Sequence, residues 1–140
     1  MMTAALPVMP AEERWRPVAY VTMEDSLARA RVVDLLQQAG WQVISQPTGF
    51  HLLREIAAVI EGEQASLKPA LILVDAHSRG CTGTSIAAGL RDLGITIPIV
   101  LIAAPGETLP ISADASLHIV DSLGARATVA SLIGPVSRRT

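Results

Sequence analysis

Short apolar runs alternate along the chain with segments in which apolar residues recur at helical spacing. The apolar runs are Val18–Val21, Trp41–Ile44, Ala70–Val74, Ile97–Ala103 and Leu117–Val120. This alternation is typical of βα units that build a parallel sheet. We therefore predict five strands at these positions.

Four of the runs are followed by a segment with an apolar helical face. The residues of these faces are Ala28, Val32, Leu35, Leu36 and Ala39, then Leu52, Ile56, Val59 and Ile60, then Ile86, Ala87, Leu90 and Leu93, and finally Val129, Leu132, Ile133 and Val136. Gly40, Gly62 and Gly94 stand where the first three helices would end, as C-capping glycines do. We predict four helices whose apolar faces pack on the sheet.

The segment between the fourth and fifth runs lacks a helical pattern. It holds Pro105, Gly106 and Pro110 within six residues, and proline removes a backbone donor and breaks a helix. We predict an irregular segment from about Pro105 to Ala115, so that the helix following the fourth strand is shortened or absent.

The third run, Ala70–Val74, has no polar position, which is typical of a strand covered on both faces. It therefore belongs near the centre of the sheet. Right-handed crossovers between five such units predict a doubly wound, flavodoxin-like α/β fold with strand order 2-1-3-4-5. In this topology the ligand site lies at the carboxyl ends of the first and third strands.

The composition is that of one densely packed domain. Of the 140 residues, 50% are hydrophobic and 17% are charged. Residues 1–16 show no sustained period, so we expect a disordered tail there, a domain over residues 17–136 and a C-terminal tail over residues 137–140.

Charge and cysteine usage exclude several classes of function. Eleven basic residues against thirteen acidic ones leave a net charge of −2, so we expect no nucleic-acid binding by this chain alone. Cys81 is the only cysteine, which excludes a disulfide within the monomer. No long apolar run indicates a signal peptide or a membrane span, and we expect a cytoplasmic protein.

Acidic residues follow the two strands that would border the ligand site. Glu24 and Asp25 come after the first strand, and Asp75 ends the third. Three carboxylates brought together repel one another unless a divalent cation lies between them, and Mg²⁺ favours oxygen ligands supplemented by water. The sequence thus predicts an acidic pocket that includes these three side chains.

The segment from Leu71 to Gly83 resembles the response-regulator receiver (CheY-like) family, in which an aspartate closes the third strand. In that family a glycine follows five residues later and another three after that, as Gly80 and Gly83 do. The Met23–Ser26 stretch resembles the family's acidic pair, and the whole resemblance covers roughly residues 17–135. It implies a receiver domain that contacts a histidine kinase or a downstream signalling protein, with a homodimer as a further form.

The resemblance also implies roles for individual residues. Asp75 corresponds to the phosphoryl acceptor, Glu24 and Asp25 to the pair that supports Mg²⁺, and the backbone carbonyl of His77 to the group that completes the coordination. These four residues are the predicted site, and Mg²⁺ is the predicted cofactor.

Two departures from the family pattern identify an atypical, degenerate member. The Ser or Thr expected at the end of the fourth strand is replaced by Ala103, and the lysine expected after the fifth strand is replaced by Asp121. The one lysine of the chain, Lys68, lies in another loop. Losing a charge-assisted hydrogen bond costs about 1.5–3 kcal/mol. We therefore expect Mg²⁺ to bind weakly and the phosphorylation-driven switch to be impaired.

Three other side chains near the motif have ordinary roles in this interpretation. We expect Arg79 to be a solvated loop arginine, with an ion pair to Glu24 or contact with a phosphoryl group as the alternative. We expect the His77 side chain to be exposed in the loop and to have no role. We expect Cys81 to be an inert thiol.

Three functions follow from this interpretation. The leading one is a pseudo-receiver, not an enzyme, that acts through protein–protein contacts, with Asp75 as an optional phosphoacceptor. The second is a conventional receiver that takes phosphate from a histidine kinase. The third is a flavin- or nucleotide-binding flavodoxin-like protein, but its glycine-rich first loop is missing, since Met23–Ser26 is acidic and contains no glycine.

Overall fold

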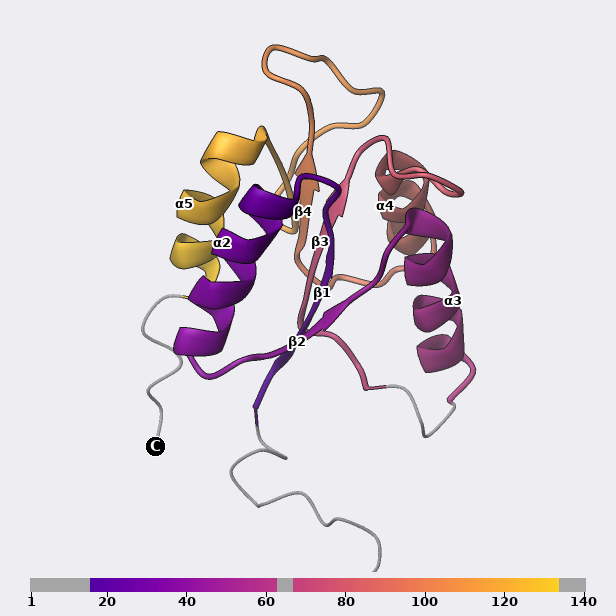
Figure 1. The fold of residues 1–140 in the computed structure, drawn as a ribbon. Coiled ribbons are helices and arrows are strands. Elements are labelled where there is room, and N and C mark those ends of the chain that lie inside the picture. The colour runs from indigo at the N-terminus through magenta and orange to yellow at the C-terminus, as the bar shows by residue number, and fades with distance from the viewer. Residues whose placement is uncertain (1–15, 63–66, 134–140) are drawn as a thin grey trace, which may run out of the picture.

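The computed structural model describes residues 16–62 and 67–133, which form a parallel sheet between two layers of helices (Figure 1). The strands are β1 (Val18–Thr22), β2 (Gln42–Ser45), β3 (Leu71–Asp75), β4 (Ile99–Ile102) and β5 (Leu117–Val120). The helices are α2 (Ser26–Gln38), α3 (Gly49–Ile60), α4 (Gly83–Asp92) and α5 (Ser122–Ile133). Residues 1–15 and 134–140, which hold nearly all of the predicted tails and Val136, lie outside the described ranges.

The sheet has the predicted order, β2-β1-β3-β4-β5, and every neighbouring pair is parallel. The register brings Thr22, the last residue of β1, beside Val74, and Asp75 beside Ile102 of β4. The carboxyl ends of the three central strands therefore meet at one edge of the sheet. The doubly wound α/β fold predicted from the sequence is confirmed.

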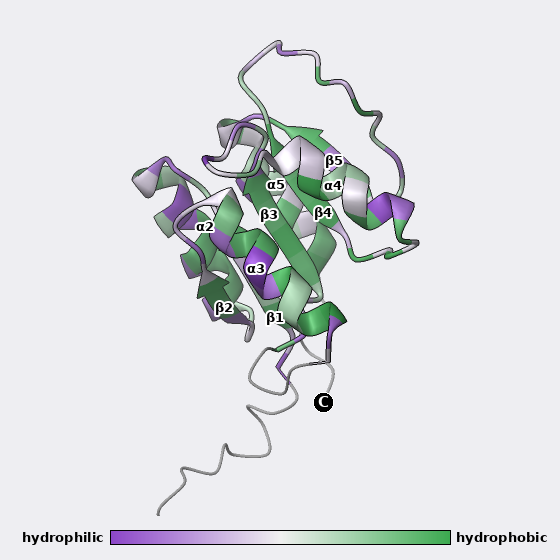
Figure 2. Cartoon of the chain, turned by 90° about the vertical axis from the view of Figure 1, so that its right-hand side faces the viewer, coloured by the Kyte–Doolittle hydropathy of each residue, from purple (hydrophilic) through white to green (hydrophobic). Residues whose placement is uncertain are grey.

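Alternating residues of each strand pack into two separate hydrophobic cores, one on each face of the sheet. Tyr20, Ile72 and Leu101 point towards α3 and α4, whereas Leu73 and Val100 point towards α2 and α5. Figure 2 shows the central strands as continuously hydrophobic, in contrast to the helices, whose colours are mixed. Burial of an aliphatic side chain contributes about 1.5–3 kcal/mol, so β3, buried at its first four positions, anchors both cores.

No helix follows β4. Residues 103–116 contain no helix or strand, as the spacing of Pro105 and Pro110 predicted. This loop nevertheless covers part of the sheet, because Leu109 and Ile111 pack against the α3/α4 core. It is also held to α4, since the Arg91 guanidinium donates to the Ser112 carbonyl and to Asp114 Oδ2, both at 2.9 Å. The loop thus takes the place of a helix without supplying its backbone hydrogen bonds.

The structure corrects several sequence predictions at the ends of elements. Ile60 and Leu93, predicted to face the core, are 53% and 65% exposed. The reason is that Ile60 is the last residue of α3 and Leu93 is the C-cap of α4, so no further turn of the same helix covers either side chain. The second strand starts at Gln42 instead of Trp41, and the fourth is limited to Ile99–Ile102.

Among the residues that the structure describes, no helix combines the length and the apolar character needed to cross a bilayer.

Candidate functional site

The loop from β1 to α2 carries the first two acidic residues of the predicted pocket. Asp25 is the N-cap of α2, and its Oδ1 accepts hydrogen bonds from the N–H groups of Leu27 (3.0 Å) and Ala28 (3.1 Å). Such a cap satisfies two of the helix's free donors and stabilises it by about 1 kcal/mol. The Asp25 carboxylate therefore has a structural task, which sequence reasoning did not assign to it.

Asp75 ends β3 and is the half-buried carboxylate of the site. Its Oδ2 accepts a hydrogen bond from the backbone N–H of Glu24 at 2.6 Å, which joins the ends of β1 and β3. Burial raises the pKa of Asp75 above its usual value, and the charges of Glu24 and Asp25 act in the same direction. The Glu24 N–H and the His77 ring oppose this rise in pKa. The structure thus brings Asp75 into the electrostatic range of both predicted acidic partners.

Arg79 lies in the loop after β3 and approaches the acidic residues from outside. Its Nε is 3.6 Å from Glu24 Oε2, and its side chain is 82% exposed. The ion pair with Glu24, given as the alternative in the sequence analysis, is therefore formed. The favoured prediction of a purely solvated arginine was incomplete. An ion pair this exposed contributes little to stability, about 0–1 kcal/mol.

The His77 side chain, predicted to have no role, contacts Glu107 in the β4–β5 loop. His77 Nε2 lies 2.5 Å from Glu107 Oε2, and Glu107 Oε1 accepts from the Ala104 N–H at 2.9 Å. The Ala104 N–H and the His77 ring hold the pKa of Glu107 below its usual value. One carboxylate thus ties the loops after β3 and β4 together. No sequence signal identifies this contact, because Glu107 lies 30 residues from His77 in an irregular segment.

The ends of β4 and β5 provide no cationic or hydroxyl group towards the pocket at the two positions where the family resemblance requires them. Ala103, at the end of β4, is buried and donates its backbone N–H to the Val120 carbonyl at 2.8 Å. Asp121, after β5, accepts from the Gly124 N–H at 2.8 Å and so begins α5. The two departures inferred from the sequence are therefore structural features, a methyl group and a helix-capping carboxylate.

The three acidic side chains do not converge as a metal site in this arrangement. Within residues 16–62 and 67–133, no three His, Cys, Asp or Glu side chains lie close enough together to hold a metal ion. Asp25 caps α2, Glu24 turns towards Arg79, and Asp75 accepts from the Glu24 backbone. With Asp25 Oδ1 used in the α2 cap and Glu24 directed to Arg79, the side chains as they lie do not fit a bound ion.

The loop that carries His77 and Arg79 is positioned by the N-terminus of α3. The Phe50 N–H donates to the Arg79 carbonyl at 3.3 Å. Gly80 has a φ of +83°, and a Cβ built there would lie 2.6 Å from Phe50 Cβ. This explains one of the two glycines of the sequence motif: position 80 combines a left-handed backbone with close contact to α3.

Comparisons with solved structures identify the same fold in receiver domains. The receiver domain of the Francisella response regulator 1452 matches with a TM-score of 0.61 and 16% identity, over 84% of this chain and 97% of its own. The Mn²⁺-bound form of response regulator Rcp1 matches with a TM-score of 0.62 and 15% identity, over 84% and 94%. The signal receiver domain of NarL from Mycobacterium tuberculosis matches with a TM-score of 0.61 and 19% identity, over 89% and 98%.

At these identities the comparisons establish the fold, which is the CheY-like receiver fold that the sequence motif indicated. No protein-family model and no curated protein sequence matches the chain.

Neutralising Asp75 is expected to leave thermal stability unchanged or to raise it by up to about 3 °C in metal-free buffer. Because the pKa of Asp75 is raised in the folded state, the protonated carboxyl stabilises the fold. This contribution is complete below the pKa that Asp75 has in the unfolded chain, and it is lost as the pH rises through the folded-state pKa. Asp75→Asn removes the charge and keeps an oxygen for the Glu24 N–H. Thermal unfolding at neutral pH with a chelator measures the effect.

Asp75→Ala is the matched control, because it removes both the charge and the hydrogen-bond acceptor. We expect it to be less stable than Asp75→Asn by about 1 kcal/mol. A fall of several degrees in Asp75→Asn itself would show that the charged carboxylate is a structural group and would contradict the interpretation as a functional pocket.

Proposed function

We propose that the chain is a pseudo-receiver: a signalling module that acts by contact with a protein partner and does not require phosphorylation of Asp75. The observation that carries this proposal is the pair of groups at the ends of β4 and β5. A phosphoryl group on Asp75 would add negative charge at an edge that already holds Glu24, Asp25 and Asp121, and stabilising it would require cations or donors. The Ala103 methyl group supplies neither.

The donors at the end of β4 are already in use, which supports the same conclusion. The Ala103 N–H is bonded to Val120 and the Ala104 N–H to the Glu107 carboxylate. A phosphoryl oxygen would have to displace Glu107 to reach the Ala104 N–H. The nearby basic groups, His77 and Arg79, are likewise paired with acidic side chains. Neither side chain is therefore free to pair with an added anion without giving up its present contact.

The fold supports a role in protein contact but does not name the partner. A histidine kinase or a downstream signalling protein is the partner class that the receiver fold suggests. The module carries out no reaction of its own in this proposal, and any binding of Mg²⁺ at Asp25 and Asp75, with the His77 carbonyl, would be weak because the acidic side chains do not converge on one point.

Treatment with acetyl phosphate and Mg²⁺, followed by intact mass spectrometry, tests the proposal. We expect no stable phosphate adduct on the wild-type chain, under conditions in which a conventional receiver domain, run in parallel, is modified. An adduct that forms on the wild type and is absent from Asp75→Asn would establish the alternative, a conventional receiver that takes phosphate from a histidine kinase.

Affinity capture from a lysate, with mass spectrometry, tests the protein-contact part of the proposal. We expect the same partner to be retained by wild type and by Asp75→Asn, since the contact does not depend on phosphorylation. Loss of the partner in Asp75→Asn would contradict this. A flavin absorption band in the purified chain would instead support the flavodoxin-like alternative.

A further inference from the structure

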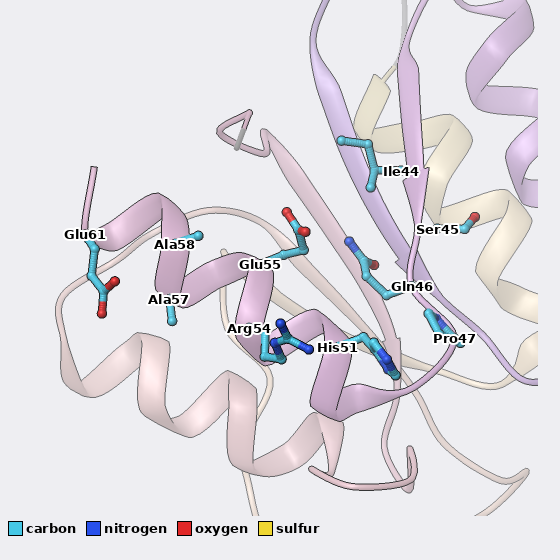
Figure 3. A pocket seen from close by; sticks show the side chains of 10 residues that line it. All are labelled: Ile44, Ser45, Gln46, Pro47, His51, Arg54, Glu55, Ala57, Ala58 and Glu61. Atoms are coloured by element: carbon cyan, nitrogen blue, oxygen red, sulfur yellow. The ribbon is translucent and has the colours of Figure 1, made fainter. Parts of the chain in front are cut away.

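A groove of about 610 Å³ lies between the edge strand β2 and helix α3, on the side of the sheet away from β5 (Figure 3). Ten residues line it: Ile44, Ser45, Gln46, Pro47, His51, Arg54, Glu55, Ala57, Ala58 and Glu61. The small side chains of Ala57 and Ala58 leave the space between helix and strand. Together with Ile44 they give the groove an apolar wall, which suits an aliphatic side chain.

Gln46, just beyond β2, presents an unused hydrogen-bond donor at this groove. The residue is only 6% exposed, and its Oε1 accepts from the Thr22 hydroxyl at 2.9 Å. Its Nε2 has no hydrogen-bond partner among the described residues, and Figure 3 shows this nitrogen on the side of the Glu55 carboxylate. A buried donor without an acceptor costs about 1–3 kcal/mol. A ligand carbonyl at the groove would remove that cost, while Glu55 would accept from a ligand N–H.

The backbone of β2 offers further donors and acceptors along the same edge. The N–H groups of Gln42 and Gln46 point to β1, where they donate to the Pro17 and Val21 carbonyls. Because successive residues of a strand point their backbone groups to opposite sides, Val43 and Ser45 direct their N–H and C=O groups outward. No strand pairs with β2 on that side within the described chain. Such an edge can accept an extended peptide as an additional strand.

The charged side chains of the groove are spread along α3, and Arg54 and Glu55 are neighbours in the sequence. His51 and Arg54 lie in the first half of the helix, whereas Glu61 is its C-cap. A ligand that extends along the groove would meet the Arg54 guanidinium near the carboxyl edge of the sheet, the Glu55 carboxylate next to it and the Glu61 carboxylate at the other end. This favours a ligand with an acidic group at the end near Arg54.

We propose that the groove between β2 and α3 binds an extended peptide segment of a partner protein, which carries an acidic residue opposite Arg54 and pairs with the outward backbone groups of Val43 and Ser45. A peptide supplies both a carbonyl for Gln46 and an N–H for Glu55, which a simple anion does not. The inference rests on the proposed function for the existence of a protein partner, and it assigns the surface and the chemistry of the contact.

Selection from a random peptide library displayed on phage, with the purified chain as target, supplies the probe. We expect enriched peptides to alternate apolar residues and to carry Asp or Glu. For one such peptide, labelled with a fluorophore, Arg54→Glu should weaken binding at least about tenfold. Arg31→Glu is the matched control: it makes the same charge change on an exposed position of α2, across the sheet, and should change affinity less than about twofold.

A second experiment tests the backbone pairing between the peptide and β2. A peptide N-methylated at alternate residues should lose about tenfold or more in affinity, because methylation removes the N–H groups that pair with β2. In NMR titrations the amides of Val43 and Ser45 should shift most. Affinity unaffected by both Arg54→Glu and N-methylation would overturn the proposal, as would an absence of enriched peptides.

The outcomes separate this inference from the proposed function. Peptides that bind elsewhere, or a lysate partner retained fully by Arg54→Glu, would overturn the groove proposal and leave the protein-contact function standing. Reversible self-association of the chain, detected by sedimentation velocity and abolished by Arg54→Glu, would show that a second copy is the occupant and would overturn the assignment to a partner peptide. Failure to capture any partner would count against the proposed function itself.

Discussion

Gly49→Ala is expected to destabilise the domain by about 3 kcal/mol, which corresponds to a fall of about 10 °C in melting temperature. Gly49 is the first residue of α3, and a Cβ built there would lie 1.8 Å from the Cys81 carbonyl oxygen and 2.9 Å from Ser78 Cβ. The nearest atom belongs to the backbone, so a rotamer change cannot relieve the clash. Either α3 or the loop after β3 has to move. Urea denaturation of the wild type and of Gly49→Ala measures the difference in free energy of unfolding.

Gly89→Ala is the matched control in α4. A Cβ at position 89 would meet no atom within 4 Å, and the residue lies in a helix interior. Alanine there should stabilise the domain by about 0.5–1 kcal/mol, since glycine is the poorer helix former. Equal stability of the two variants would show that α3 and the loop are not packed as the structure has them.

Raising the pH from 10 to about 12 is expected to cost the folded state about 2 kcal/mol through Tyr20. The Tyr20 side chain is fully buried, and its hydroxyl donates to the Leu67 carbonyl. Burial raises the Tyr20 pKa from 10.0 to about 12, and the charge of Glu55 adds to the rise. The unfolded chain therefore loses this proton first. The contribution of Tyr20 to the free energy of unfolding is complete below pH 10 and is lost as the pH rises through the folded-state pKa.

The single tyrosine of the chain makes this titration easy to observe. Tyrosinate absorbance should appear in the native protein only near the raised pKa, and urea denaturation should show the parallel loss in stability. Tyr20→Phe should remove the pH-dependent part of the loss, although it forgoes the hydrogen bond to Leu67. Glu55→Gln should lower the pKa of Tyr20. A native tyrosinate signal at pH 10 would contradict the burial of this hydroxyl.

Much of the fold was predictable because it depends on local patterns that repeat. The unbroken apolar run before Asp75 identified the central strand, and the prolines at 105 and 110 identified the missing helix. The errors in predicted burial occurred at helix ends, because the periodicity of a sequence does not show where a helix stops covering the sheet. Ile60 and Leu93 continue the helical pattern, but both stand at helix ends, where their side chains are exposed.

The candidate site was predictable only in part. The sequence placed Glu24, Asp25 and Asp75 at one edge, and the structure brings the three within electrostatic range of each other. The sequence alone could not show how each carboxylate is used. The capping by Asp25 and the hydrogen bond from the Glu24 N–H to Asp75 depend on the exact path of the loop. Nor could it reveal the contact between His77 and Glu107, or the unused donor of Gln46, which depend on tertiary packing.

The loop that replaces a helix after β4 also determines where the molecule opens most easily. Residues 103–116 pack two partly buried apolar side chains, Leu109 and Ile111, on the α3/α4 core and make a few hydrogen bonds, whereas α2, α3 and α4 each have at least two buried apolar side chains. Sub-global unfolding starts where the least buried surface is lost. We therefore expect the β4–β5 loop to open at a lower free energy than β1 and β3, which are buried at the centre of the sheet and open only with global unfolding.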